Sequence, residues 1–224
     1  MASARGQRIG IWIIAIVMTV GTIGSFTVII LANNNQKTDS AREAVLASAY
    51  QKEMTDYQAK VDAQTASLSA QYYDTFSPYA SEVGAFDKDN SSTLMQNDLL
   101  VGVGDAITQT SSYAAYYIGW LPDGTIFDQS IDSGKLKAPL PVTANAGVID
   151  GWATGVVGMK VGGIRELTIP GPQAYPSGVP SSNGSVAIPA ESPLKFVIMI
   201  IPTPATIPQP QPSAELLKLS GQGQ

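Results

Sequence analysis

The stretch from Tyr117 to Trp152 constrains the fold of this chain more than any other part. Its first half reads Tyr-Ile-Gly-Trp-Leu-Pro-Asp-Gly-Thr-Ile-Phe-Asp, which is typical of a strand, a tight turn and a second strand. Proline sets φ for the turn, and Gly124 takes the left-handed position that follows. Residues 147–152 are an apolar pair leading into a short helix. Together these pieces present aromatic and aliphatic surface beside one carboxylate, which suits an apolar, carbonyl-rich ligand.

The residue types that are missing exclude most hydrolytic chemistry. The 224 residues include no histidine and no cysteine, so there is no Ser-His-Asp triad, thiolate metal site or cysteine nucleophile. We therefore expect neither a metal ion nor a cofactor. The net charge of −5 argues against non-specific nucleic-acid binding. Rotation about a peptide bond needs none of the missing groups.

Four motifs, in their expected order, resemble those of the FKBP-type peptidyl-prolyl isomerases. The first is Tyr-x-Gly-x-Leu-x-Asp-Gly-x-x-Phe-Asp from Tyr117, and the second is Val-Ile-x-Gly-Trp-x-x-Gly from Val148. The other two are Ala174-Tyr175 and Ile188-Pro189, ahead of the last strand. The resemblance implies an α+β domain over residues 85–201, in which a bent antiparallel sheet wraps around one short helix.

The resemblance also implies which residues form the site. Carried over one by one, the catalytic positions fall on Tyr117, Phe127, Asp128, Trp152, Tyr175 and Phe196, and the substrate-binding positions on Val148, Ile149 and Ile188. In this family's arrangement Trp152 forms the floor of the site. The backbone N–H of Ile149 and the hydroxyl of Tyr175 donate hydrogen bonds to substrate carbonyls. The partners it implies are proline-containing polypeptides.

Each of these residues also has an ordinary structural explanation. Trp152 and the pair Val148-Ile149 are equally well explained as core residues, because most buried apolar residues serve packing. Asp128 is explained as a turn residue or a helix-cap acceptor, and Tyr175 as a residue that anchors a loop. The chain departs from the family pattern twice. Pro139-Leu140-Pro141 stands where aromatic residues are usual, and the loop over residues 176–187 is several residues longer.

Residues 9–32 form an uncharged apolar run of 24 residues. At about 1.5 Å per residue the run reaches roughly 36 Å, which is enough to cross a membrane core of about 30 Å. A cleaved signal peptide is the alternative, but its apolar region is usually only about 7 to 15 residues long. Arg5 and Arg8 lie closer to the run than Lys37 does, which favours cytoplasmic residues 1–8 and an extracytoplasmic domain.

Residues 38–84 predict a helical stalk. Ser40 and Glu43 fit a capping box, and Ser77-Pro78 ends the helical pattern. One helix face carries apolar residues at spacings of three and four: Leu46, Tyr50, Met54, Tyr57, Val61 and Leu68. This face has two open interpretations, a seam between copies of the chain in a homo-oligomer and a surface that packs on the domain that follows.

The remaining patterns complete the expected α+β domain and add a tail. Strands are predicted at 98–107, 112–120, 164–169 and 194–201, an edge or irregular strand at 135–142, and a helix at 150–159. Residues 202–224 form a proline-rich tail, extended and polyproline-like to Ser213. Residues 214–219 then form one helical turn or a strand.

The sequence leaves three classes of function. The first is a membrane-anchored prolyl isomerase that assists the folding of proteins at the membrane or cell surface. The second is an FKBP-like domain that binds a peptide or partner with little catalysis. The third is structural, in which the stalk organises an oligomer and the domain is a passive cap.

Overall fold

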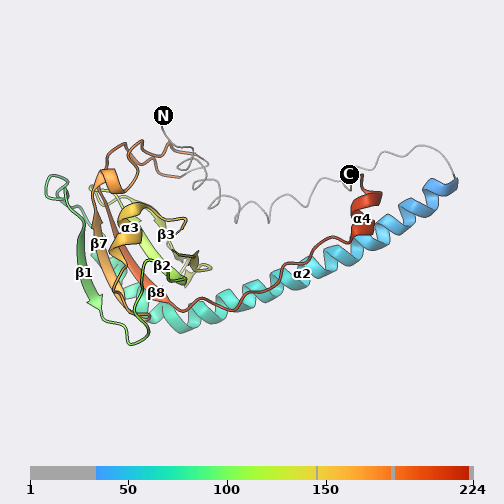
Figure 1. The fold of residues 1–224 in the computed structure, drawn as a ribbon, viewed down its shortest axis with the longest axis horizontal. Coiled ribbons are helices and arrows are strands. Elements are labelled where there is room, and N and C mark those ends of the chain that lie inside the picture. The colour runs from blue at the N-terminus through green and yellow to red at the C-terminus, as the bar shows by residue number, and fades with distance from the viewer. Residues whose placement is uncertain (1–33, 145, 183–184, 222–224) are drawn as a thin grey trace. The chain divides into compact units, whose positions relative to one another are not determined.

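The computed structural model describes residues 34–144, 146–182 and 185–221 (Figure 1). They belong to two compact units, residues 63–205 and residues 34–62 with 206–221, and each unit is described by itself. The expected transmembrane segment, residues 9–32, lies outside the described residues. Within the described ranges, no helix combines the length and the apolar character that a membrane span requires.

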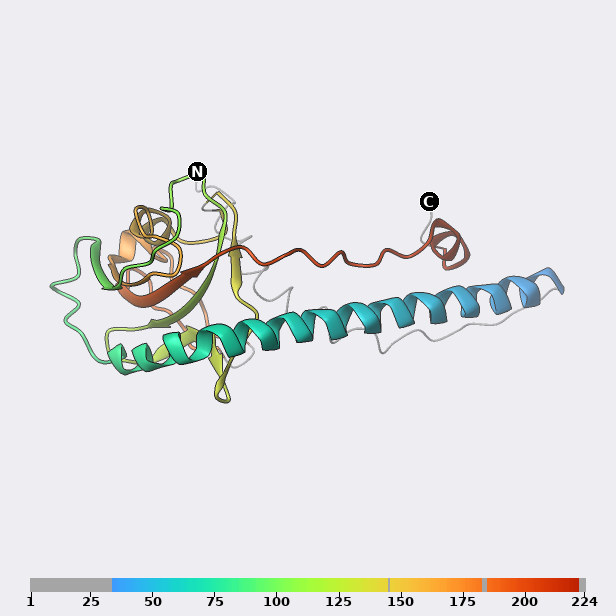
Figure 2. The same ribbon diagram turned by 90° about the horizontal axis from the view of Figure 1, so that it is seen from below.

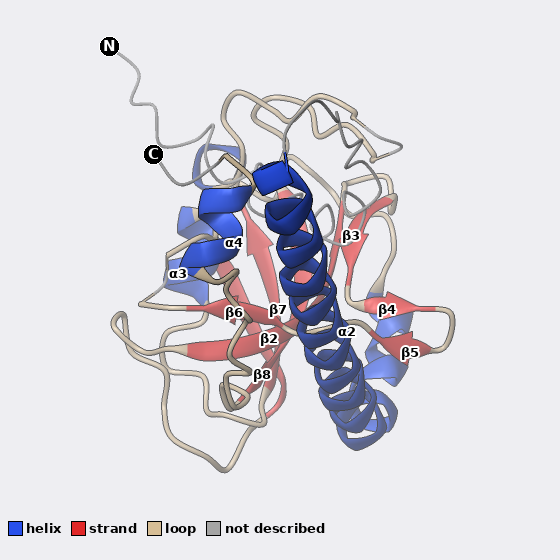
Figure 3. Cartoon of the chain, turned by 90° about the vertical axis from the view of Figure 1, so that its right-hand side faces the viewer, coloured by secondary structure: helices blue, strands red, loops and turns tan. Residues whose placement is uncertain are grey.

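The unit of residues 63–205 is built on one antiparallel sheet. Its strands run in the order β1-β7-β8-β2-β3, and β6 pairs with the first half of β2. The bounds are β1 Met95–Leu100, β2 Tyr113–Trp120, β3 Ile126–Gln129, β6 Leu140–Val142, β7 Ile164–Ile169 and β8 Leu194–Ile201. A separate small hairpin, β4 (Ile131–Asp132) and β5 (Lys135–Leu136), lies at one side of the sheet (Figure 3).

The central strand β8 is apolar on both faces because each face of the sheet packs against a helix. Along β8, Phe196, Ile198 and Ile200 belong to one core cluster, and the alternate residues Val197 and Met199 belong to another. This alternation is the period of two that a strand imposes on its side chains. The first cluster includes Trp152 of α3 (Asp150–Gly155), and the second includes Phe76, the last residue of α2 (Asn34–Phe76).

Helix α3 lies close to the sheet because two glycines face it. A Cβ atom at Gly151 would lie 2.3 Å from Cγ2 of Ile169, and one at Gly155 would lie 2.6 Å from Cδ1 of Leu167. The two glycines are four residues apart, so they share one face of the helix. This close approach brings Trp152 against the strands.

The other face of the sheet is covered by the end of α2 and by the 3₁₀ helix η1 (Ser77–Glu82). Phe76 is fully buried there, and the rings of Tyr72 and Phe76 lie 6.1 Å and 6.3 Å from the ring of Tyr116. The backbone N–H of Leu136 donates to Oγ of Ser69 over 2.9 Å. The helical stalk expected from the sequence is present as the long helix α2 (Figure 2), and its last turns, from residue 63, belong to the same compact unit as the sheet.

Several expected elements are confirmed and others differ. The strands at 164–169 and 194–201 have the predicted bounds, and an antiparallel sheet with one short helix against it is present. The strand expected at 98–107 is β1, which begins earlier, at Met95, and ends at Leu100. Beyond its end Gly102 packs against the backbone near residue 161, where a Cβ would lie 2.4 Å from the carbonyl oxygen of Val161. Helix α3 ends at Gly155 rather than at residue 159, before a turn in which Gly158 has φ +82°.

The second unit contains the first part of α2 and the tail. Helix α2 already begins at Asn34, so the predicted capping box at Ser40 does not mark its start. The tail ends in helix α4 (Ala214–Leu219), whose first turn is capped by the Ser213 hydroxyl, which accepts from the N–H of Leu216 over 3.1 Å. Of the two alternatives for residues 214–219, the helical turn is therefore correct.

Candidate functional site

Four aromatic rings meet on the face of the sheet that carries α3, and we call them the aromatic cluster: Tyr117, Phe127, Trp152 and Phe196. The ring of Phe196 lies 5.3 Å from that of Trp152 and 5.5 Å from that of Phe127, both nearly edge to face. Tyr117 lies 5.4 Å from Trp152 and 6.4 Å from Phe196. Edge-to-face pairs at these separations are favourable because the positive edge of one ring meets the negative face of the other.

The members of the aromatic cluster differ in exposure. Trp152 and Phe196 are buried, at 3% and 4% exposure, whereas Tyr117 and Phe127 are only half-buried. The half-buried rings present an apolar surface, and the buried indole and Phe196 support it from below. Trp152 is the most deeply buried ring of the aromatic cluster.

One carboxylate borders the aromatic cluster. Asp128 accepts a hydrogen bond from the Tyr117 hydroxyl and another from the N–H of Gln129 over 2.8 Å. Burial raises the pKa of the Tyr117 phenol well above its usual range, and the nearby Asp128 carboxylate raises it further. Burial and Asp128 also raise the pKa of Tyr175, so both phenols keep their protons and remain donors at neutral pH.

The register of the strands explains why these groups converge. Gly119 of β2 lies opposite Asp128 of β3 and opposite Phe196 of β8. A Cβ at residue 119 would lie 2.6 Å from Cε1 of Phe196 and 2.7 Å from Cζ of Phe127. The space above this glycine is therefore occupied by the two rings. Gly119 is part of the first sequence motif, but its role in making room for the rings was not predicted.

Tyr113 is a second residue that the sequence analysis missed. The indole N–H of Trp152 donates to the Tyr113 hydroxyl over 3.1 Å, which fixes the orientation of the indole. Tyr113 and Tyr117 are four residues apart on one strand, so they point to the same face of the sheet. This spacing was the only signal in the sequence that could have pointed to Tyr113. It shows which face of the sheet Tyr113 lies on, but not that its partner is Trp152 of α3.

The three predicted substrate-binding residues lie at the edge of the same core cluster. Val148 and Ile149 are half-buried and pack against it, and Ile149 is the N-cap of α3 with an extended backbone. Ile188 is buried at 6% exposure and exchanges two backbone hydrogen bonds with Val179, of 2.8 Å and 2.9 Å. The fold thus brings all nine predicted site residues to one region. Eight belong to this core cluster or pack against it, and Asp128 is connected to it by its hydrogen bond with the Tyr117 hydroxyl.

The two departures from the family pattern also reach this region. Leu140, in the segment where aromatic residues are usual, is half-buried and packs against the core cluster that contains Trp152. Val179 and Val186 of the long loop pack against the same cluster. The β-bridge between Val179 and Ile188 anchors this loop beside the site.

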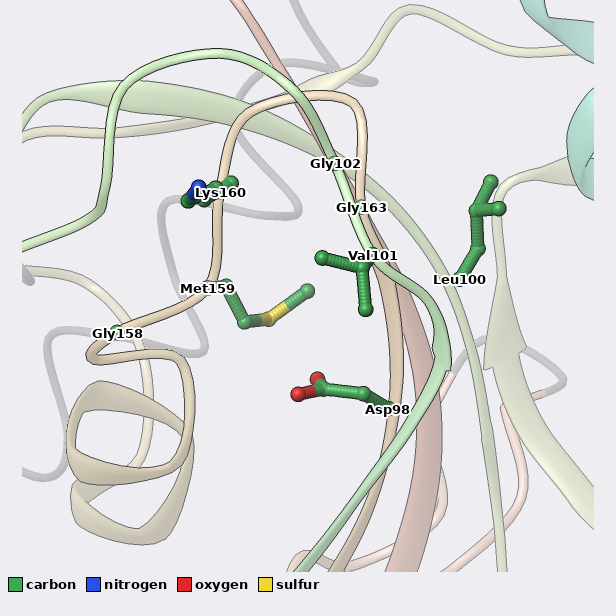
Figure 4. A pocket seen from close by; sticks show the side chains of 8 residues that line it. All are labelled: Asp98, Leu100, Val101, Gly102, Gly158, Met159, Lys160 and Gly163. Carbon is green, nitrogen blue, oxygen red and sulfur yellow. The ribbon is translucent and has the colours of Figure 1, made fainter.

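A small pocket lies elsewhere, between the end of β1 and the turn after α3 (Figure 4). Its volume is about 70 Å³, far below the roughly 300–1,000 Å³ of a typical ligand site. The carboxylate of Asp98 in its lining is already engaged by Arg165, whose Nε and Nη2 donate to it over 2.6 Å and 3.0 Å. This pocket does not fit a peptide.

No metal centre is present in the part of the chain that the structure describes. Within those ranges, no three acidic side chains come together as metal ligands would. The aromatic cluster therefore offers apolar surface and hydrogen-bond donors, beside a single carboxylate.

Comparison with known proteins identifies the family. Residues 104–201 match the family model described as FKBP-type peptidyl-prolyl cis-trans isomerase. The chain is 37% identical over 112 residues to the chloroplastic peptidyl-prolyl cis-trans isomerase FKBP16-3 of Arabidopsis thaliana, covering 49% of this chain and 48% of that protein. It is 42% identical over 84 residues to an FK506-binding protein of Neisseria meningitidis serogroup A, covering 37% of this chain and 74% of that protein.

Two solved structures are also similar. The crystal structure of AtFKBP13 has 34% identity and a TM-score of 0.43, covering 50% of this chain and 93% of that chain. FkpA from Escherichia coli has 26% identity and a TM-score of 0.42, covering 88% of this chain and 87% of that one. The chain spans about half the length of the chloroplastic relative and about three quarters of the neisserial one. On the strength of the neisserial match, the chain belongs to the FKBP-type peptidyl-prolyl cis-trans isomerases.

Proposed function

We propose that the aromatic cluster speeds rotation about X–Pro peptide bonds in polypeptide substrates, with Trp152 beneath the proline ring. The observation that carries this proposal is the convergence of four rings beside the Tyr117–Asp128 hydrogen bond. Phe127 and Tyr117 form walls, Phe196 supports them, and Val148, Ile149 and Ile188 bind the flanking residues.

The chemistry needs selective stabilisation of a twisted amide. Resonance gives the C–N bond a rotation barrier of about 18–20 kcal/mol, while the two X–Pro isomers differ by only about 0.5–1 kcal/mol. Twisting places the lone pair on nitrogen and lowers the polarity of the amide. An apolar surface therefore disfavours the planar ground state relative to the twisted state, and about 1.36 kcal/mol of this difference gives a tenfold rate.

Hydrogen bonds position the substrate without moving a proton. The Tyr175 hydroxyl and the N–H of Ile149 donate to substrate carbonyls. Asp128 holds the Tyr117 ring in place and supplies a negative field. The chain has no histidine or cysteine to act as an acid–base catalyst near neutral pH, and the proposed reaction requires none.

A proline-containing peptide assay tests this proposal. The full chain should speed isomerisation, and FK506, after which the neisserial relative is named, should inhibit it. Phe127→Ala should lower kcat/KM by about tenfold or more, which corresponds to at least 1.4 kcal/mol. Phe86→Ala is the matched control, because Phe86 is also half-buried but packs on the opposite face of the sheet. Equal rates for both variants would contradict the assignment.

The proposal includes attachment to a membrane through residues 9–32, with residues 1–8 cytoplasmic and the domain extracytoplasmic, where it assists the folding of other proteins. The uncharged length of this run supports it. A chain without residues 1–35 should leave the membrane fraction and keep its activity. An insoluble product would indicate that the run belongs to the fold.

The second candidate is a domain that binds peptides or a membrane partner with little catalysis. The loop anchored by Val179 and Ile188 favours it, because a loop fixed beside the aromatic cluster can restrict which peptides reach it. Peptide binding without acceleration would establish this candidate. Homo-oligomerisation through α2 stays a prediction, and the mass of residues 36–224 in solution tests it.

A further inference from the structure

The apolar stripe of α2 lies beside the tail of the same chain. Tyr57, together with Glu53, Asp56 and Lys60, lines a groove whose other wall is residues 206–210. Tyr57 belongs to the stripe that the sequence analysis left open, either as an oligomer seam or as a packing surface. The stripe residues Leu46, Tyr50, Met54, Tyr57 and Val61 are all half-buried.

The tail packs with the period of a polyproline helix. Pro204, Ile207 and Pro210 are half-buried, and the residues between them are exposed. A polyproline II helix has three residues per turn, so every third side chain lies on one face. Proline favours this conformation and leaves little entropy to lose on docking. The exposure pattern therefore identifies one inward face of the tail.

The two segments also match in length. Arg42 Nε lies 2.6 Å from Glu215 Oε1, so the tail meets the helix a second time near its start. From Arg42 to Tyr57 an α-helix rises about 22 Å. From Pro208 to Ser213 a polyproline helix rises about 16 Å, and the first two residues of α4 add about 3 Å. The tail can therefore run antiparallel to α2 at nearly full extension, with the side chains of Arg42 and Glu215 spanning the remaining few ångströms.

The short connection between the tail and the sheet favours docking of the tail on α2 of its own chain over docking on α2 of another chain. Ala205 comes four residues after the last strand residue, Ile201, and its carbonyl accepts from Nε2 of Gln64 over 2.8 Å. A segment tethered this closely has an effective concentration of about the millimolar range for its own helix. A second copy of the chain would have to compete with that concentration.

We propose that residues 204–215 are a built-in strap that occupies the apolar stripe of α2 in cis. The strap takes the place that a second copy would occupy in a coiled coil, so it is the rival of the predicted homo-oligomer through this face of α2. The stripe is thus a surface for an extended, proline-rich segment with an apolar residue at every third position. Gln64, which interrupts the stripe for a coiled coil, bonds the backbone of this segment.

Cysteine crosslinking of the full chain, solubilised in a mild detergent, tests the strap. The chain has no cysteine of its own, so Tyr57→Cys with Ile207→Cys gives one defined pair. A short bis-maleimide should join this pair within one chain. The matched control is Thr55→Cys with Ile207→Cys, because Thr55 is exposed and lies about 200° around the helix from Tyr57. Its yield should be about tenfold lower, as expected when the reactive groups are not held together.

Hydrogen exchange supplies a second readout. Ile207→Asp places a charge on the inward face and should speed amide exchange in residues 46–61 about fivefold or more. Gln209→Asp, on the outward face, should not change it, and exchange in β8 should be the same in both variants. Any one of three outcomes would overturn the proposal. These are crosslinked dimers in place of intramolecular products, equal crosslinking yields in the two cysteine pairs, and unchanged amide exchange in Ile207→Asp.

Discussion

The indole N–H of Trp152 donates a hydrogen bond to the hydroxyl of Tyr113 over 3.1 Å. The donor lies on α3 and the acceptor on β2, so this bond fixes the indole relative to the strand that also carries Tyr117. Tyr113 contacts no substrate in the proposed mechanism. In that proposal it is a positioning residue, acting through the indole of Trp152.

Tyr113→Phe should therefore reduce activity without unfolding the domain. Loss of one neutral hydrogen bond is worth about 1 kcal/mol, which predicts a fall in kcat/KM of about three- to tenfold. The fall should appear mainly in kcat, because the peptide-binding groups remain. Tyr116→Phe removes a hydroxyl from the opposite face of the same strand and should leave the rate unchanged.

Gly119→Ala should disrupt the aromatic cluster. The added methyl group would lie 2.6 Å from Phe196 and 2.7 Å from Phe127, so both rings must move. Overpacking of this kind costs about 1–3 kcal/mol of stability. We expect a lower urea midpoint and at least a tenfold loss of isomerase activity, which corresponds to about 1.4 kcal/mol in the barrier. Gly84→Ala is the control, because a Cβ there meets no atom within 4 Å.

Tyr116→Phe should stabilise the protein. The Tyr116 side chain is fully buried, and its hydroxyl has no hydrogen-bond partner among the residues that the structure describes. An unsatisfied buried hydroxyl costs about 1–3 kcal/mol, and phenylalanine keeps the ring and its packing against Phe76. The free energy of unfolding should rise by about 1 kcal/mol. A decrease would show that the hydroxyl has a partner.

Alkaline pH should destabilise the fold in a defined window. Burial raises the pKa of Tyr113 and of Tyr116 from 10.0 to about 12. Both groups are neutral when protonated, so the stability linked to them is present below pH 10 and is lost as the pH rises through 12. Urea unfolding should give a constant free energy from pH 7 to about 9 and a steep decline above 10. Tyr116→Phe should make that decline shallower.

The sequence predicted the parts of this fold whose signal is local. Strands β7 and β8 have the expected bounds because branched and aliphatic residues dominate both segments and turns flank them. The four motifs fix the order of the nine candidate site residues, and the structure brings all nine to one region.

The parts that were missed depend on contacts between distant segments. The apolar stripe of the predicted stalk ended at Leu68, and the sequence did not show that Tyr72 and Phe76 cover Tyr116. The alternation along β2 placed Tyr113 and Tyr117 together, but could not name the indole as a partner. Nothing in the motif showed that Gly119 leaves the space that two rings fill. Contacts between distant segments also place residues 63–84 in the compact unit that contains the sheet.

The central claim is that apolar aromatic surface, and not proton transfer, accelerates rotation of the prolyl bond. The most direct measurement is kcat/KM for a proline-containing peptide with the wild-type chain and Trp152→Leu, whose near-ultraviolet and far-ultraviolet circular dichroism show that the domain is folded. We predict at least a tenfold fall, about 1.4 kcal/mol, because the floor of the site is lost. A folded Trp152→Leu variant with the wild-type rate would contradict this account.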